Sequence, residues 1–343
     1  MVDLSTSYLG FKLAHPLVPG ASPLADDLDG VRRLVDAGAP MITLRSLIAA
    51  PLSISDEVRL IDRGEIVLQS RVDPGEESYP PRSVFAGLHD APEHACQPDK
   101  YCEHIQRVRQ AIDRDIPIVA SLYARRMQQW ISNAKSIEEA DADALELNIY
   151  GMAIAPDIAW KPVQQQIVEL VYAVKREIRI PVAVKLLPFY KSFDQFVRKL
   201  PKVGADALVL YNGFYRSDCG VDPLSDPFLH AMSSPLDPHY RLRWLARLSG
   251  RIGIDLAYSG GARNSLHAIK AVMCGAAAVQ IVSALIRHGP KYLRTLRDEM
   301  AAWMEEHDYE SVQQLRGKVS MQAFDSVEAF DMAYNSRILV KPQ

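Results

Sequence analysis

The stretch AYSGGARNSLHAIKAVMCGAAAVQIVSALIRHGP, residues 257–290, contains the clearest structural pattern of the chain. An apolar run ends at Gly260 and Gly261, an amphipathic segment over residues 266–273 follows, and a second apolar run begins at Ala277. This order predicts a strand, a tight turn, a helix and a second strand. The stretch is therefore one βαβ unit of a parallel sheet.

Short apolar runs of the same kind recur along the rest of the chain. Most are almost continuous in Val, Ile, Leu and Ala, which is typical of strands that are covered on both faces. Segments with helical periodicity lie between them, for example over residues 28–37 and 163–178. We expect eight strands, over residues 16–21, 41–44, 116–122, 144–148, 182–186, 207–210, 252–257 and 277–282.

The predicted fold class is α/β, a (β/α)₈ TIM barrel, because eight such units in about 250 residues are typical of that barrel. A doubly wound open sheet is the alternative. The phrase G-A-[DA]-A closes a helix and opens a strand both at residues 204–207 and at residues 275–278, and this repeat favours the barrel.

Two intervals do not follow the repeat. Residues 50–110 are rich in Pro, Asp, Glu and His, and we expect a loop-rich insertion there, after the second strand. Residues 308–343 are a charged C-terminal extension with one or two short helices. We expect residues 1–343 to form a single domain.

Composition excludes several classes of protein. The 343 residues are 48% hydrophobic, which excludes intrinsic disorder, and a net charge of −3 argues against a nucleic-acid partner. The most apolar run, residues 276–286, is too short to span a membrane and is interrupted by Gln280. Four cysteines without close spacing indicate a reducing compartment, so we expect a cytoplasmic protein.

The glycine pair predicts an anion-binding site. Gly260 and Gly261 follow one strand, and Val282 and Ser283 follow the next, so the two loops are neighbours at the carboxyl end of a barrel. Backbone N–H groups in such loops bind phosphate. A simple tight turn at the glycines is the alternative interpretation.

Several segments resemble the dihydroorotate dehydrogenase family of FMN-dependent (β/α)₈ barrels, most closely a bacterial branch of proteins similar to these dehydrogenases. The similar segments are YLGFKLAHPLVPGAS, LELNIY, IPVAVKLLPF, LVLYNGF, CGAAAVQIVSALIRHGP and EEHDYESVQQLRGK. The resemblance implies FMN as the cofactor, bound by Ala21, Ser22, Asn148, Lys185, Asn212 and the two loops at Gly260, Gly261, Val282 and Ser283.

Lys185 is also notable on physical grounds. It interrupts the apolar run of residues 182–186, and a lysine in such a run must reach the strand end or meet an anion. The resemblance implies that it stabilises the negative charge of the reduced flavin. The alternative is an ion pair with an acidic residue of the barrel. For Asn148 and Asn212, capping of the following loop is the alternative.

The sequence departs from the family at the position of the catalytic base. The family has a Cys or Ser after the fourth strand, but this chain reads Ile149-Tyr150-Gly151-Met152-Ala153, and Arg45 stands where the family has a lysine. Tyr150 and Cys219 are the candidate replacements. Tyr150 needs a neighbouring cation such as Arg45 or Lys185 to ionise, and Cys219 is a lone loop thiol.

The family resemblance implies oxidation of dihydroorotate to orotate in pyrimidine biosynthesis. An FMN oxidoreductase that acts on another small substrate, or an FMN-binding subunit of a redox complex, are the alternatives, and a sugar-phosphate enzyme without flavin is a third. We expect a small-molecule substrate, a redox partner protein, a homodimer and no membrane partner. The loose spacing of His89, His94, His104, Cys96 and Cys102 indicates a solvated loop, so we expect no metal.

Overall fold

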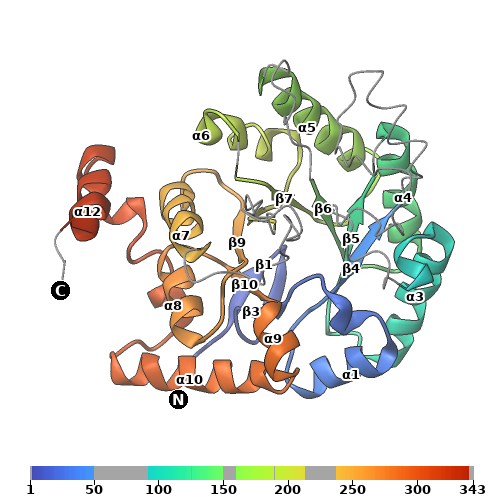
Figure 1. Ribbon diagram of the computed structural model, residues 1–343, viewed down its shortest axis with the longest axis horizontal. Helices are drawn as coiled ribbons and strands as arrows, with labels where there is room; N and C mark the ends of the chain where they lie inside the picture. The colour runs from blue at the N-terminus through green and yellow to red at the C-terminus, as the bar shows by residue number, and fades with distance from the viewer. Residues whose placement is uncertain are drawn as a thin grey trace, which may run out of the picture.

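Eight parallel strands form one sheet that curls into a barrel in the computed structural model (Figure 1), which describes residues 2–49, 92–124, 126–149, 160–188, 190–212 and 237–339. The neighbours run β3-β10-β9-β8-β7-β6-β5-β4, and contacts between β3 and β4 bring the two edges together. The strands are β3 (Leu17–Pro19), β4 (Ile42–Ile48), β5 (Ile118–Tyr123), β6 (Ala144–Asn148), β7 (Val182–Leu186), β8 (Ala207–Leu210), β9 (Asp255–Ser259) and β10 (Ala278–Ile281).

These strands confirm the TIM-barrel prediction, and β4 and β9 depart furthest from their predicted bounds. β4 continues to Ile48, past a register shift between Thr43 and Ser46 in its pairing with β5. β9 begins at Asp255, where its pairing with β8 starts. The side chains of both strands are largely buried. The apolar runs in the sequence predicted this burial, since they are typical of a sheet that is covered on both faces.

Helices surround the barrel, and most of them connect one strand to the next (Figure 1). Their apolar faces pack against the outer face of the sheet, so the core is an annulus between strands and helices. The helices are α1 (Leu28–Asp36), α3 (Pro98–Ala111), α4 (Met127–Glu139), α5 (Trp160–Lys175), α6 (Phe193–Val197), α7 (Asp237–Leu248), α8 (Ser265–Met273), α9 (Ser283–His288) and α10 (Tyr292–Glu306).

The helix α3 corrects the predicted insertion. Residues 50–110 were expected to be loop-rich, but residues 98–110 belong to α3, the barrel helix between β4 and β5. Tyr101, Ile105 and Val108 are spaced three or four residues apart and are fully buried, which is the physical reason for a helix there. Residues 50–91 lie outside the described part of the chain.

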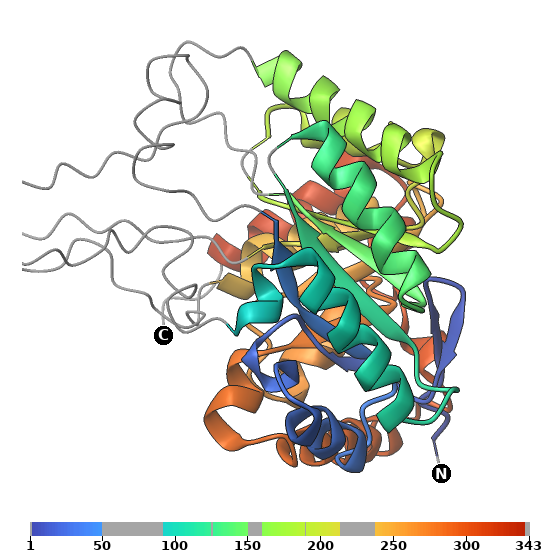
Figure 2. The same ribbon diagram turned by 90° about the vertical axis from the view of Figure 1, so that its right-hand side faces the viewer.

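An antiparallel hairpin of β1 (Thr6–Tyr8) and β2 (Phe11–Leu13) lies at the amino end of the barrel (Figure 2). The amide of Leu9 donates to Asp255 Oδ2 at 2.9 Å, and Asp255 is the first residue of β9. Tyr8, Leu9 and Leu13 are buried in the barrel interior, in one apolar cluster with residues such as Ala144 and Ala183. The hairpin therefore closes the amino end of the barrel, and the carboxyl ends of the strands lie at the opposite end.

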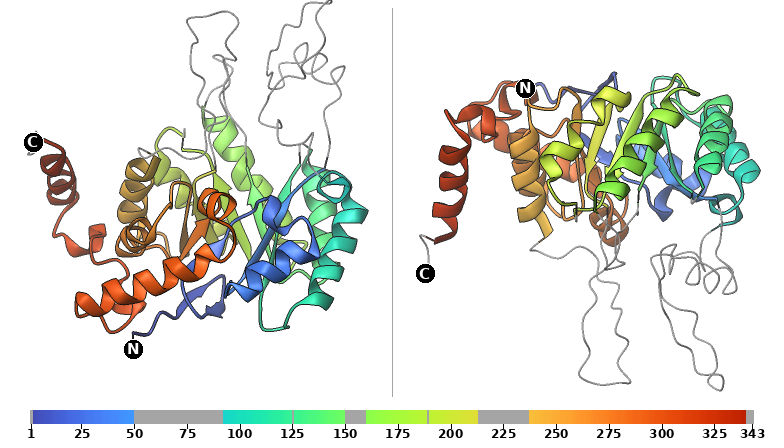
Figure 3. Two further views of the ribbon diagram at one scale, coloured as in Figure 1. Left: turned by 60° about the horizontal axis from the view of Figure 1, so that its bottom comes forward. Right: turned by 90° about the horizontal axis from the view of Figure 1, so that it is seen from above.

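Beyond residue 308 the chain forms α11 (Val312–Leu315) and α12 (Val327–Leu339), and α12 stands at the side of the barrel next to α7 (Figure 3). Phe330 of α12 is fully buried, and Asp331 pairs with Arg243 and Arg247 of α7 at 3.2 Å each. No helix within the described ranges is long and apolar enough to cross a membrane.

Candidate functional site

The predicted cofactor residues gather at the carboxyl end of the barrel. Asn148 ends β6 and lies opposite Lys185 of β7 in the strand register. Ser22 follows β3, Asn212 follows β8, and the two predicted loops follow β9 and β10, which are paired neighbours. Because all eight strands are parallel, these positions share one end of the barrel, where enzymes of this architecture have their active sites.

The two loops predicted to bind an anion lie side by side. Gly260 and Gly261 have φ angles of 91° and 83°, a left-handed backbone that glycine adopts without strain. The neighbouring loop passes close to the end of β3, since a Cβ on Gly20 would lie 2.8 Å from Val282 Cγ2. The amide of Gly20 donates to the carbonyl of Ile281 at 3.2 Å. Because β9, β10 and β3 are paired neighbours, the loops that follow these three strands begin next to one another.

Arg241 supports the glycine loop from behind, and the sequence did not indicate it. This residue of α7 is 2% exposed. Its Nε donates to the carbonyl of Ser259 at 2.7 Å and its Nη2 to the carbonyl of Asn212 at 3.5 Å. A Cβ on Gly260 would lie 2.8 Å from Arg241 Nη2, so only glycine fits against the guanidinium.

Lys185 lies inside the barrel and is 6% exposed. Its Nζ donates to Glu146 Oε1 at 3.2 Å and to Gln280 Oε1 at 2.9 Å. Glu146 is thus an acidic barrel residue of the kind that the sequence analysis gave as the alternative partner of Lys185, in place of a cofactor anion. An ammonium group has three N–H donors, so within the described residues one donor direction remains for a ligand.

Glu146 and Gln280 complete a closed triad with this lysine. Glu146 is 1% exposed and Gln280 is 3% exposed, and Gln280 Nε2 donates to Glu146 Oε2 at 2.6 Å. The sequence interpretation missed both residues as parts of the site. The signal was present, because each interrupts an apolar strand in the same way as Lys185 does.

A line of hydroxyl groups connects this triad to Asn148. Asn148 Nδ2 donates to Ser46 Oγ at 2.9 Å, and Ser46 Oγ lies 2.7 Å from Ser121 Oγ. Ser121 Oγ in turn donates to Glu146 Oε1 at 3.5 Å. Side chains from β4, β5, β6, β7 and β10 therefore form one buried polar network beneath the strand ends.

Asn212 acts on the backbone of its neighbours. Its Nδ2 donates to the carbonyls of Ile149 at 3.5 Å and Lys185 at 3.4 Å, and it is 1% exposed. These contacts fit the capping alternative, since the side chain holds the ends of adjacent strands together. Tyr150 and Cys219, the candidate bases, lie outside the described residues.

Arg45, considered as a cation that would ionise Tyr150, pairs with Asp26 among the described residues, and Tyr150 itself lies outside them. The distance from Arg45 Nη1 to Asp26 Oδ2 is 2.6 Å, and both side chains are mostly buried. Burial raises the pKa of Asp26, and Arg45 opposes that rise. The ion pair fixes Arg45 at the register shift of β4, where Ser46 turns toward the polar network.

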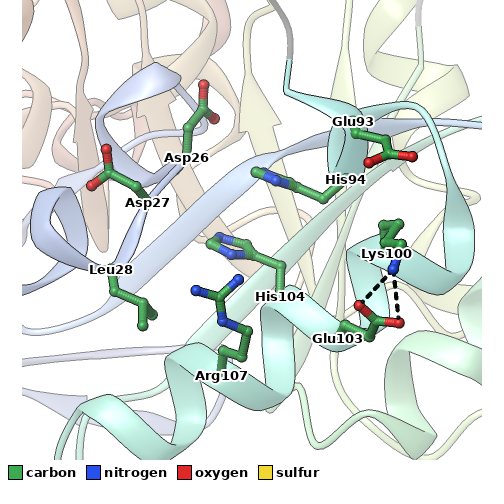
Figure 4. Close-up of a pocket in the computed structure, with 9 residues that line it drawn as sticks. All are labelled: Asp26, Asp27, Leu28, Glu93, His94, Lys100, Glu103, His104 and Arg107. Carbon is green, nitrogen blue, oxygen red and sulfur yellow. Dashed lines mark hydrogen bonds and ion pairs between the residues drawn. The ribbon is translucent and has the colours of Figure 1, made fainter.

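A cavity of about 220 Å³ lies between the starts of α1 and α3 (Figure 4). The rings of His94 and His104 stack there with centroids 4.2 Å apart. Burial, together with His104, lowers the pKa of His94 to about 4. In the described chain no three His, Cys, Asp or Glu side chains are grouped to hold a metal. The cavity is lined by Asp26, Asp27, Leu28, Glu93, His94, Lys100, Glu103, His104 and Arg107, none of them a predicted site residue.

Comparisons with known proteins identify a family for the chain. A model of the family described as dihydroorotate dehydrogenase matches residues 96–304, well over half of the chain. A protein of Thermoplasma volcanium named dihydroorotate dehydrogenase B (NAD(+)), catalytic subunit, is 21% identical over 92% of this chain and 98% of its own length. Relatives with the same name from Methanothermobacter thermautotrophicus and Methanocaldococcus jannaschii are each 23% identical, over 92% and 89% of this chain and 97% and 94% of their own lengths.

Proposed function

The chain belongs to the dihydroorotate dehydrogenase family, and from this premise we propose that it is an FMN-dependent oxidoreductase that converts dihydroorotate to orotate in pyrimidine biosynthesis. The observation that carries the proposal is the buried ammonium group of Lys185 on β7, at the barrel end where the loops of Gly260 and Ser283 lie side by side. A buried cation beside an anion-binding loop pair suits a ligand with a phosphate and a charge-accepting ring.

The described residues fit FMN. Gly260 and Gly261 leave their backbone without side chains, and the packing of Val282 against Gly20 holds the second loop close to them. These loops would bind the phosphate group of FMN. Lys185 would use its remaining N–H donor on the flavin ring, with Asn148 across the strand pair from it. When bound, FMN supplies the acceptor of a hydride from the substrate.

The protein's own residues have distinct tasks in this reaction. Lys185 offers a positive charge where negative charge develops on reduction, which is electrostatic stabilisation by a preorganised group. Asn148 is held by Ser46, so its amide has a defined orientation before ligands bind. Asn212 fixes the strand ends on either side of Lys185 through the carbonyls of Ile149 and Lys185.

A base must remove the proton from the substrate carbon as hydride leaves. We propose Tyr150, the residue two positions after Asn148, or Cys219 for this task. The family resemblance implies a Cys or Ser directly after the fourth strand. Tyr150 lies there but is a tyrosine, and Cys219 lies much further along the chain. This difference in the sequence supports a second candidate function, in which an FMN oxidoreductase of the same architecture acts on another small substrate.

The names of the relatives bear on partners. Each of the three is a catalytic subunit with NAD(+) in its name. We propose the same division of labour here, with substrate oxidation in this chain and electron transfer through a redox partner protein. We also propose that this chain forms a homodimer.

A spectrum and a titration test the function. The freshly purified protein is expected to be yellow, and anaerobic addition of dihydroorotate is expected to bleach the flavin absorbance. A yellow protein that keeps its absorbance would exclude dihydroorotate and support the second candidate. A colourless protein that does not take up added FMN would overturn both.

A further inference from the structure

We propose that Glu146 is a positioning residue that, together with Gln280, fixes the ammonium group of Lys185 in the barrel interior beneath the strand ends. This inference rests on the proposed function, because it concerns how the chain prepares Lys185 for FMN. It goes further in assigning the task to a residue that does not itself reach the strand ends, since Glu146 lies two residues before Asn148 on β6.

The geometry allows Glu146 to act only through its neighbours. Lys185 and Ser121 donate to Oε1 of the carboxylate, and Gln280 donates to Oε2. The carboxylate is 1% exposed, so it is shielded by the barrel wall and by the hairpin below. Gln280 forms hydrogen bonds with both other members of the triad, because its amide oxygen accepts from Lys185 and its amide nitrogen donates to Glu146.

Charge balance explains why a carboxylate is needed there. An ammonium group buried in an apolar strand is disfavoured relative to the neutral amine unless an opposite charge lies close. Gln280 offers only a dipole, whereas Glu146 offers a full negative charge at 3.2 Å. Glu146 therefore compensates the buried charge of Lys185 before any ligand binds, and removal of either partner would leave one buried charge uncompensated.

The other titratable groups around the pair do not replace this role. Tyr8 of β1 approaches Glu146 from the base of the barrel, and burial, Glu146 and Asp255 raise its pKa. Tyr101 of α3 lies behind β5, where burial raises its pKa and its hydroxyl lies within hydrogen-bond distance of the carbonyls of Arg45 and Ser121. Both phenols are neutral over the working pH range, so within the described chain the charge that faces Lys185 comes from Glu146.

The test compares Glu146→Gln with the wild-type holoenzyme. The measurements are the FMN dissociation constant and the reduction potential of the bound flavin. Glu146→Gln is expected to bind FMN roughly tenfold to a hundredfold more weakly and to lower the reduction potential, because the ammonium group of Lys185 loses its charged partner on β6. Asp255→Asn, the same change at the amino end of β9, is the control and is expected to follow wild type.

The outcomes separate this inference from the proposed function. A Glu146→Gln protein with the FMN affinity and reduction potential of wild type overturns the positioning role and leaves the FMN proposal intact. A wild-type protein that binds no FMN overturns both. If Glu146→Gln does not fold, Glu146→Asp keeps the charge but draws the carboxylate back by one methylene group, and it is expected to weaken FMN binding and lower the reduction potential. Wild-type values in that variant would also overturn the inference.

Discussion

Lys185 and Glu146 form an ion pair in the interior of the barrel, with side chains 7% and 1% exposed. Breaking such a pair leaves one uncompensated buried charge, which costs more than the pair itself contributes. We expect Lys185→Met to lower the free energy of unfolding by about 3–5 kcal/mol.

The double variant Lys185→Met with Glu146→Gln removes both charges and is expected to recover part of that loss, as measured by urea denaturation. If the double variant lost as much unfolding free energy as the two single variants together, the result would contradict the pairing. Flavin binding should stay weak in the double variant, because stability is restored and the cation is not.

Gly260 has both a left-handed backbone and a guanidinium at the position of its missing side chain. Gly260→Ala is expected to cost about 1–3 kcal/mol of unfolding free energy and to weaken FMN binding, because Arg241 or the loop must move. Gly253→Ala is the matched control, since Gly253 has a φ of 71° but a Cβ added there would meet nothing within 4 Å. If Gly253→Ala lost as much stability and FMN affinity as Gly260→Ala, the result would contradict the steric explanation.

His15 links the start of β3 to the end of α1, and its Nε2 donates to the carbonyl of Gly38 at 2.9 Å. Burial lowers its pKa from 6.5 to about 4. The unfolded chain therefore binds a proton more readily than the folded one, so the contribution of His15 is present above about pH 6.5 and is lost as the pH falls toward about 4.

The expected loss from this residue is on the order of 3 kcal/mol across that window. Urea denaturation at a series of pH values measures it, and His15→Gln, which keeps a donor toward Gly38, should flatten the profile. An unchanged profile in His15→Gln would show that other groups cause the acid sensitivity.

At the scale of elements, the described contacts of α12 with the rest of the chain include one buried ring and one acidic side chain. Phe330 is fully buried and packs edge to face with Phe324 at 5.4 Å, whereas the pairs of Asp331 with Arg243 and Arg247 are partly exposed. Exposed ion pairs contribute up to about 1 kcal/mol, and a buried aromatic ring contributes more.

Phe330→Ala is therefore expected to release α12 from α7, with faster amide exchange in α12 and little change in the barrel strands. Hydrogen exchange followed by mass spectrometry measures this difference. Asp331→Asn is the milder comparison and should leave α12 largely protected. Equal exchange in both variants would mean that the ion pairs carry the contact.

At the scale of the whole molecule, the proposed FMN site draws on residues that are far apart in the sequence, from the end of β3 to the loop after β10. A ligand that binds only the folded chain stabilises it, by about 2.7 kcal/mol at a concentration one hundred times its dissociation constant. We expect the melting temperature to rise with added FMN, and to rise less with riboflavin, which lacks the phosphate. A rise that is the same for both would argue against the anion loops at Gly260 and Ser283.

The amino-acid sequence by itself determined the order of strands and helices and the identity of one charged group in the barrel. Apolar runs and helical periodicity are local patterns, so the eight strands could be placed from short windows of sequence. Lys185 stood out for the same reason, because its apolar neighbours are adjacent in the chain. The end of the insertion was placed wrongly, because charged and polar residues around Tyr101, Ile105 and Val108 concealed the apolar face of α3.

Only the tertiary structure decided which groups meet. Glu146 lies 39 residues from Lys185 in the sequence, and Gln280 lies 95 residues from it, so no local pattern could join them. Barrel closure brings β6, β7 and β10 around one interior, and the register turns these three side chains inward. The physical reason is that burial makes each polar group require a partner, and the fold alone determines which partner is within reach.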